Sequence, residues 1–164
     1  MLTVHATCVA IAGEAVLLRG PSGAGKSDLA LRLIETYAGN HAGLVADDRV
    51  VLQAMDQRLI AAAPDSIRGL LEIRGLGPVR LTPVAPTPVA LVIDLVPLAD
   101  VPRLPDEDYE TLAGIRLPRL SLHAFEPSAP AKVKWALARA AAGRLFEPDE
   151  IGAAGSVIQF RRPA

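Results

Sequence analysis

Hydrophobic residues in the first third of the chain gather in short apolar runs that are typical of β-strands. Thr3–Ile11 and Ala15–Leu18 predict two strands joined by a turn, and Leu44–Ala46 predicts a buried strand that ends at two acidic residues. Val50–Ala54 and Arg58–Ala62 flank a polar dipeptide and predict a β-hairpin. Together these segments predict a β-sheet that contains short hairpins.

In two further segments the composition or the spacing of the hydrophobic residues is typical of an α-helix. Leu29 and Leu33 fall on one stripe of a helix that is expected from Ser27, directly after a glycine-rich loop. Gly39 lies just beyond the expected end of this helix and is a common stop signal. An alanine-rich segment, Lys132–Ala142, predicts a last helix near the end of the chain.

Glycine and proline interrupt the middle of the chain. Gly69–Gly77 is a short apolar segment bounded by glycines, and Val89–Val96 is the strongest signal for a buried strand. Ten of the fourteen prolines lie between Pro78 and Pro130, so this stretch is expected to hold short strands and loops but no long helix.

The composition is that of one globular domain. Of the 164 residues, 51 % are hydrophobic and 21 % charged, which excludes a disordered or collagen-like chain. The net charge is −1, so the basic surplus of a general nucleic-acid binder is missing and no nucleic-acid partner is expected. We expect one domain over residues 1–143, followed by a tail, 144–164, to which the pattern assigns no element.

The sequence also indicates the cellular compartment in which the protein is expected. Cys8 is the only cysteine, which excludes an internal disulfide. No apolar run approaches the roughly 18 residues of a membrane span, and the first ten residues lack the basic start of a signal peptide. We therefore expect no membrane partner and a cytoplasmic location.

One segment matches the phosphate-binding pattern G-x-x-x-x-G-K-[ST] in full. It consists of Gly20, Pro21, Ser22, Gly23, Ala24, Gly25, Lys26 and Ser27. Its glycines allow consecutive N–H groups to point at phosphate oxygens, Lys26 can reach the β- and γ-phosphates, and the Ser27 hydroxyl can bind Mg²⁺. A glycine-rich turn that only caps a helix is the alternative, but the expected flanking strand and helix favour a nucleotide site.

Three acidic positions could complete such a site. Asp47 and Asp48 end a strand, where neighbouring side chains point to opposite faces, so one could meet the metal while the other faces the substrate. A solvated turn is the alternative for this pair. Glu72 lies in the glycine-bounded segment, and Asp94 interrupts an apolar run. Because more apolar residues follow Asp94, a position in the middle of a strand is equally compatible with its pattern.

Several of these residues together resemble a known family, the catalytic domain of bacterial HPr kinase/phosphorylase. The similarity lies in His5, the phosphate loop, the run Leu44–Arg49 and, most specifically, Leu-Glu-Ile-Arg-Gly-Leu-Gly at Leu71–Gly77. Arg103 follows the predicted strand Val89–Val96 at about the place of the family's loop arginine. The resemblance is good over roughly residues 3–103 and continues weakly to residue 143. The sequence resembles the shortened form of the family that is found in some proteobacteria and lacks the N-terminal domain.

This resemblance implies a fold, an activity and a set of residues. The expected fold is α/β, a P-loop NTPase-like kinase core with a mixed β-sheet, flanking helices and short hairpins. The expected enzyme is a protein-serine kinase that uses ATP to phosphorylate HPr, with Mg²⁺ on Ser27 and Glu72. Asp48 would accept the serine proton. The resemblance also implies a catalytic role for His5, Lys26 and Arg103. It implies a supporting role for Asp47, Arg74 and Gly75.

The family also removes the phosphate by phosphorolysis, which consumes inorganic phosphate and yields pyrophosphate, and it acts in phosphotransferase signalling and carbon metabolism. It is typically hexameric, so a homo-oligomer is expected. Here His123–Pro130 stands where the family carries a basic Pro-Val-x-Pro-Gly-Arg-Asn-type segment, which makes kinase activity the main expectation and leaves phosphorolysis open. A small-molecule kinase, a plain NTPase and a non-catalytic nucleotide sensor are the alternatives.

Overall fold

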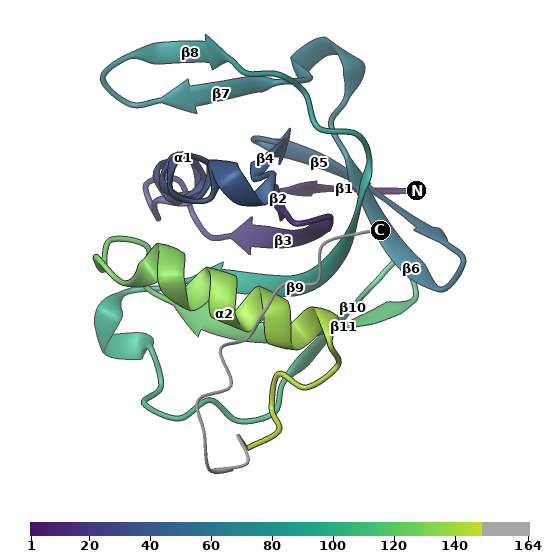
Figure 1. Ribbon diagram of the computed structural model, residues 1–164, viewed down its shortest axis with the longest axis vertical. Helices are drawn as coiled ribbons and strands as arrows, with labels where there is room; N and C mark the ends of the chain where they lie inside the picture. Colours follow the sequence, from purple (N-terminus) through teal and green to yellow (C-terminus); the bar gives the residue numbers. More distant parts are fainter. Residues whose placement is uncertain (149–164) are drawn as a thin grey trace.

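The apolar segments pair into one curled, mixed β-sheet, which a computed structural model describes over residues 1–148 (Figure 1). Within these residues the sheet consists of β1 (Leu2–His5), β2 (Thr7–Ile11), β3 (Glu14–Arg19), β4 (Gly43–Ala46), β5 (Arg49–Met55), β6 (Arg58–Ala62), β9 (Thr87–Leu95), β10 (Tyr109–Leu112) and β11 (Ile115–Leu122). Its main order is β1-β5-β6-β9-β3-β2-β4, and β11 joins β9 with β10 outside it. The predicted α/β class is confirmed.

The strand that precedes the phosphate loop lies in the middle of this sheet. β3 pairs in parallel with β9, through Leu18 and Ile93 among others, and antiparallel with β2. Its residues Ala15–Leu18 are fully buried. The loop therefore leaves from the interior of the sheet, and α1 (Lys26–Thr36) starts directly after it. A 3₁₀ turn, η1 (Ala38–Asn40), contains the predicted stop at Gly39.

The predicted strand over residues 3–11 is wrong in its extent, because the chain changes partners within it. β1 pairs with β5, whereas β2 pairs with β3 and β4. The break is at Ala6, which is fully buried and donates its N–H to the carbonyl oxygen of Asp48 at 3.3 Å. Both halves are rich in apolar and β-branched residues, so periodicity alone could not reveal the change. Its consequence is that His5, at the end of β1, lies beside Asp48.

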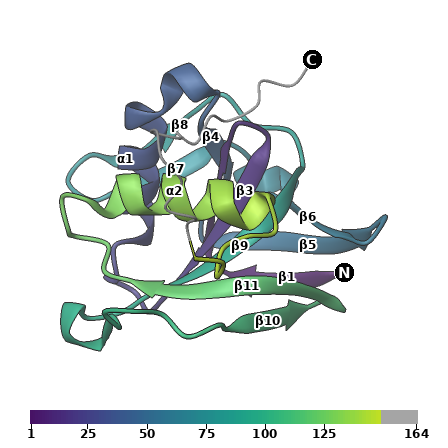
Figure 2. The same cartoon turned by 60° about the horizontal axis from the view of Figure 1, so that its bottom comes forward.

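Alternate residues of the central strands enter two separate cores. Val16 and Leu18 pack with both helices on one face, and Ala15 and Leu17 pack within the curl of the sheet on the other. The two views agree that α1 and α2 (Ala129–Ala141) cover the same face (Figure 1, Figure 2). Central strands buried on both sides explain why their sequence shows apolar runs and little alternation.

The last helix begins three residues earlier than predicted. α2 starts at Ala129 because Pro130 lies in its first turn, where a missing N–H costs no helical hydrogen bond. Gly143, with a φ of +71°, follows its end. Neither helix within residues 1–148 is long and apolar enough to cross a membrane. Most of the predicted tail, residues 149–164, lies outside the described residues.

The glycine-bounded segment forms a small sheet of its own. β7 (Leu70–Ile73) and β8 (Gly77–Arg80) pair antiparallel and lie near α1 (Figure 1). Leu71 is fully buried in the core beneath the helices, which anchors the hairpin. At its base, Gly69 has a φ of +72° and accepts a hydrogen bond from the N–H of Leu81 at 2.7 Å. This hairpin brings the predicted metal ligand Glu72 to the phosphate loop.

Replacing Gly69 by alanine is expected to lower the free energy of unfolding by about 1–3 kcal/mol. The new Cβ would lie 2.5 Å from the carbonyl oxygen of Leu81, and the left-handed backbone at this position disfavours any side chain. Gly39→Ala is the matched control, because nothing lies within 4 Å of a Cβ there. Urea denaturation of both variants measures the difference. Equal stabilities would contradict the requirement for glycine at position 69.

Candidate functional site

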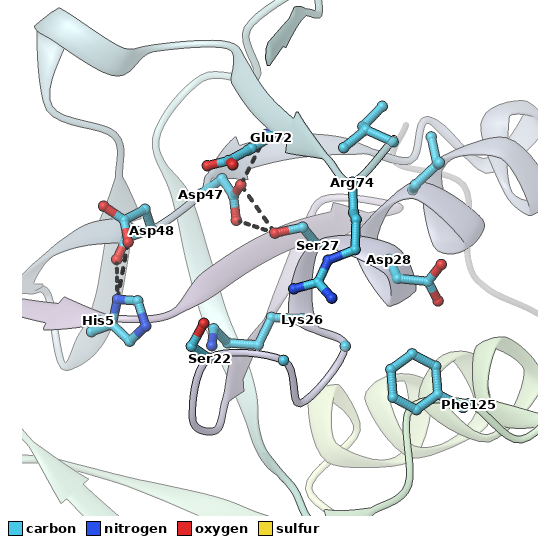
Figure 3. A pocket seen from close by; sticks show the side chains of 14 residues that line it. His5, Ser22, Lys26, Ser27, Asp28, Asp47, Asp48, Glu72, Arg74 and Phe125 are labelled. Carbon is cyan, nitrogen blue, oxygen red and sulfur yellow. Dashed lines mark hydrogen bonds and ion pairs between the residues drawn. The ribbon is translucent and has the colours of Figure 1, made fainter. Parts of the chain in front are cut away.

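A cavity of about 520 Å³ lies over the phosphate loop. Its walls come from segments that are far apart in the sequence: the end of β1, the loop and first turns of α1, the residues after β4, β7 and its turn, and the segment before α2 (Figure 3). A concave site with convergent polar groups is the usual form of a small-molecule binding site.

The backbone of the phosphate loop is tightly packed at two of its glycines. Gly20 has a φ of +151°, and a Cβ there would lie 3.0 Å from the carbonyl oxygen of Leu95. Gly25 has a φ of +93°, and a Cβ there would lie 2.6 Å from the Cβ of Ala124. The loop can therefore take this shape only with glycine at both positions. The shape presents backbone N–H groups and the N-terminus of α1 to an anion.

Lys26 places its charge inside the loop. Its side chain is buried, and its ammonium donates hydrogen bonds to the carbonyl oxygens of Gly20 at 2.7 Å and Pro21 at 3.1 Å. The ammonium thus lies among the atoms that would surround a phosphate. Together with the helix N-terminus it makes this part of the cavity electropositive.

Asp47 is the hub of a buried hydrogen-bond network. Its carboxylate, whose residue is 7 % exposed, accepts hydrogen bonds from the Thr7 hydroxyl at 2.7 Å, from the Ser27 hydroxyl at 3.1 Å and from the Glu72 backbone N–H at 3.3 Å. These donors come from β2, α1 and β7. The carboxylate therefore joins the sheet, the phosphate loop and the small hairpin. Sequence reasoning missed Thr7, although a polar residue heading an otherwise apolar strand was a usable signal.

Asp48 turns away from its neighbour. Its backbone has a φ of +64°, which is uncommon for a residue other than glycine and ends the strand sharply. The His5 Nδ1 atom lies 3.0 Å from the carbonyl oxygen of Asp48 and 3.1 Å from its Oδ1 atom. The two side chains are 57 % and 69 % exposed, respectively. The acidic pair thus supplies one buried carboxylate and one that is open to a substrate.

β7 and its turn supply the wall opposite the loop. Glu72 and Arg74 line the cavity, and in the view of Figure 3 the Glu72 carboxylate is drawn beside Asp47 and the Arg74 guanidinium between Ser27 and Lys26. Gly75, which sequence reasoning grouped with them, does not line the cavity. It has a φ of +92° in the β7–β8 turn, so its contribution is to the conformation of the hairpin.

The oxygen atoms near Ser27 fit a magnesium ion that arrives with phosphates. Within residues 1–148, no group of three or more His, Cys, Asp or Glu side chains is placed to hold a metal by itself. Mg²⁺ commonly takes one or two protein oxygens and completes its shell with water and phosphate oxygens. The Ser27 hydroxyl and the carboxylates of Asp47 and Glu72 are donors of this kind.

Gly20, Pro21 and Ala24 shape the phosphate loop without lining the cavity, and the predicted residues Arg103 and Asp94 lie elsewhere. Arg103 is exposed in the segment between β9 and β10. Asp94 lies within β9, where its carboxylate pairs with the Arg19 guanidinium at 2.8 Å. Arg19 also binds Glu110, and this hydrogen bond holds the pKa of Glu110 below its usual range. Asp94 therefore belongs to a structural ion-pair network.

Comparison with known proteins identifies the family of this chain. Residues 1–122 match the family model described as HPr Serine kinase C-terminal domain. The chain is 35 % identical over 132 residues to the HPr kinase/phosphorylase of Limosilactobacillus reuteri (strain DSM 20016). It is 40 % identical over 131 residues to that of Geobacillus thermodenitrificans. These alignments cover 73 % of this chain but 40 % and 41 % of the relatives, so the chain spans about two fifths of their length.

A solved structure has the same fold. The Hpr(Ser) kinase/phosphatase from Coxiella burnetii superposes with a TM-score of 0.68 at 26 % sequence identity. The superposition covers 82 % of this chain and 93 % of the other. The similarity therefore extends beyond the phosphate loop to most of the domain.

Removing the Thr7 hydroxyl tests the Asp47 network. Thr7→Val keeps the shape but deletes a donor to a buried carboxylate, so the free energy of unfolding is expected to fall by about 1.5–3 kcal/mol. Thr87→Val is the matched control, because this buried threonine donates to the neutral carbonyl oxygen of Ala85, and a loss of about 0.5–1.5 kcal/mol is expected. Denaturant unfolding measures both variants. A loss at Thr7 no larger than at Thr87 would argue against the network.

Proposed function

The chain belongs to the HPr serine kinase C-terminal domain family, and on this premise we propose that it transfers the γ-phosphoryl group of ATP to a serine hydroxyl of an HPr-type phosphocarrier protein. One observation carries the proposal: a single cavity joins a phosphate-binding loop to the exposed carboxylate of Asp48. Phosphoryl transfer needs these two parts, a site that holds the phosphates and a group that orients the incoming hydroxyl.

The loop would bind and orient the donor. Its backbone N–H groups and the Lys26 ammonium would hold the β- and γ-phosphates, and the transition state of the transfer is stabilised mainly by such positioning and charge. Ser27 and Glu72 would hold Mg²⁺, which neutralises phosphate charge when it is bound. Asp47 would keep the Ser27 hydroxyl in place through its hydrogen bond at 3.1 Å.

Asp48 would bind the hydroxyl group that accepts the phosphoryl group. Its exposed carboxylate can hydrogen-bond a serine hydroxyl from a protein surface, hold it in line with the γ-phosphate and take its proton. His5, within 3.1 Å of the Asp48 Oδ1 atom, would fix the orientation of this carboxylate. In the reverse direction the same carboxylate would return the proton to serine while inorganic phosphate accepts the phosphoryl group and forms pyrophosphate. The relatives named above carry both activities in their name.

Other expectations remain proposals of the same kind. A homo-oligomer and a cytoplasmic location are predicted from the sequence. A catalytic role for Arg103 is also retained as a proposal, although it would require the segment between β9 and β10 to approach the cavity. The phosphorolysis reaction is a separate proposal, since His123–Pro130 differs from the family's basic segment.

The location of a labelled phosphoryl group tests the function. The chain is incubated with γ-labelled ATP, Mg²⁺ and a purified HPr protein, and label on an HPr serine is the expected result. A variant HPr with that serine replaced by alanine is the control and should stay unlabelled. Label released as free phosphate without HPr would support a plain NTPase instead. Absence of any turnover would support a nucleotide sensor.

Asp48→Asn tests the proposed base. The amide can no longer take a proton, so transfer to HPr is expected to fall by roughly 10²–10⁴-fold while ATP binding is kept. Asp56→Asn is the matched control, because Asp56 is also exposed and also has a positive φ, of 47°, but lies in the β5–β6 turn outside the cavity. Single-turnover transfer and ATP titration measure the two effects. Equal turnover by Asp48→Asn and the parent would remove the assigned role.

A further inference from the structure

The cavity has apolar lining residues that the proposed transfer does not use. They are Leu31 of α1, Ile73 of β7 and Phe125, which lies in the segment between β11 and α2. Phe125 is 56 % exposed and, unlike the similarly exposed Leu98 and Trp135, it lines the cavity. A large exposed ring within a binding cavity suggests a ligand contact.

The order of the lining residues along the cavity indicates which part of a ligand would lie near Phe125. Figure 3 shows His5 and Asp48 at one end of the cavity, Lys26 and Ser27 in the middle, and Phe125 at the opposite end. A triphosphate that lies on the loop with its terminal phosphate toward Asp48 extends its other end toward Phe125. In a nucleotide this other end carries the ribose and the base.

The ring lies directly against the phosphate loop. A Cβ added to Gly25 would be 2.9 Å from the Cζ atom of Phe125. The ring of His123 meets Phe125 edge to face, with centroids 5.7 Å apart and an interplanar angle of 72°. His123 is held in turn, because its Nδ1 atom lies 2.9 Å from the carbonyl oxygen of Val96. The phenyl ring is therefore supported on one side and exposed toward the cavity.

The backbone on both sides of the ring is fixed as well. The Arg32 guanidinium of α1 donates hydrogen bonds to the carbonyl oxygen of Ala124 and, at 3.4 Å, to that of Glu126. Asp28, another residue of the cavity, holds Arg32 through a hydrogen bond at 2.9 Å. A ring on a fixed backbone loses little conformational freedom when it binds a ligand.

We propose that Phe125 is the stacking platform for the base of the nucleotide whose phosphates occupy the loop. Bases stack on aromatic rings because both have π faces, and such stacking is tolerant of the identity of the base. This inference rests on the proposed use of ATP and adds the residue that binds its base. The continuity of the ring with the phosphate loop favours a base over a protein segment as the occupant.

A comparison of ligands with and without a base tests the proposal. ATP and inorganic tripolyphosphate, each with Mg²⁺, are titrated into the full chain and three variants by calorimetry. The variants are Phe125→Ala, Phe125→Tyr, which keeps an aromatic ring, and Trp135→Ala. Trp135 is a matched control because it is 53 % exposed on α2 and does not line the cavity. Tripolyphosphate carries the same phosphates and reports whether the loop is intact.

Phe125→Ala is expected to weaken ATP binding by roughly 5- to 150-fold, the range for loss of one stacked ring, and to leave tripolyphosphate binding unchanged. Phe125→Tyr and Trp135→Ala should bind both ligands like the parent. Unchanged ATP binding by Phe125→Ala would overturn the proposal, and so would an equal loss of both ligands, which would mean that the ring only supports the loop. Failure of the parent to bind either ligand would instead overturn the proposed function, and this inference with it.

Discussion

The buried carboxylate of Asp47 is the constraint on which the arrangement of the site depends. A carboxylate in a protein interior is destabilising by several kcal/mol unless donors replace the lost water. Here the donors are the Thr7 hydroxyl, the Ser27 hydroxyl and the Glu72 backbone N–H, each from a different element. Because all three must be in place to satisfy one group, the phosphate loop, the central sheet and the β7–β8 hairpin keep a fixed relation. The cavity is a consequence of that relation.

The same network separates the two neighbouring acids. Asp47 is held inward by its donors, and the left-handed backbone of the next residue, Asp48, carries that side chain outward to His5. Two carboxylates one residue apart thus meet different surroundings, one closed and fully hydrogen-bonded, the other open to solvent. The proposed division between holding the donor and meeting the acceptor rests on this local geometry.

The sequence was most informative where eight consecutive residues define a geometry, as in Gly20–Ser27, and where an apolar run is short and bounded, as in the β5–β6 hairpin. It was least informative where distant segments meet. Nothing local indicates that the chain changes partners at Ala6, that Asp47 is the partner of Thr7, or that Phe125 lies against the loop, because each depends on contacts between residues far apart in the sequence. The family resemblance also suggested Arg103, but in the structure that residue is exposed outside the cavity.

Lys26 shows how the phosphate loop holds its own charge. The ammonium donates to the carbonyl oxygens of Gly20 and Pro21, so the loop itself fixes where this charge lies. An anion that binds this ammonium must compete with these two carbonyl oxygens. Charged phosphate oxygens are much stronger acceptors than neutral carbonyls, whereas weakly basic anions are not. For the proposed nucleotide, this means that its phosphate charge, and not its size alone, would decide how well it competes for Lys26.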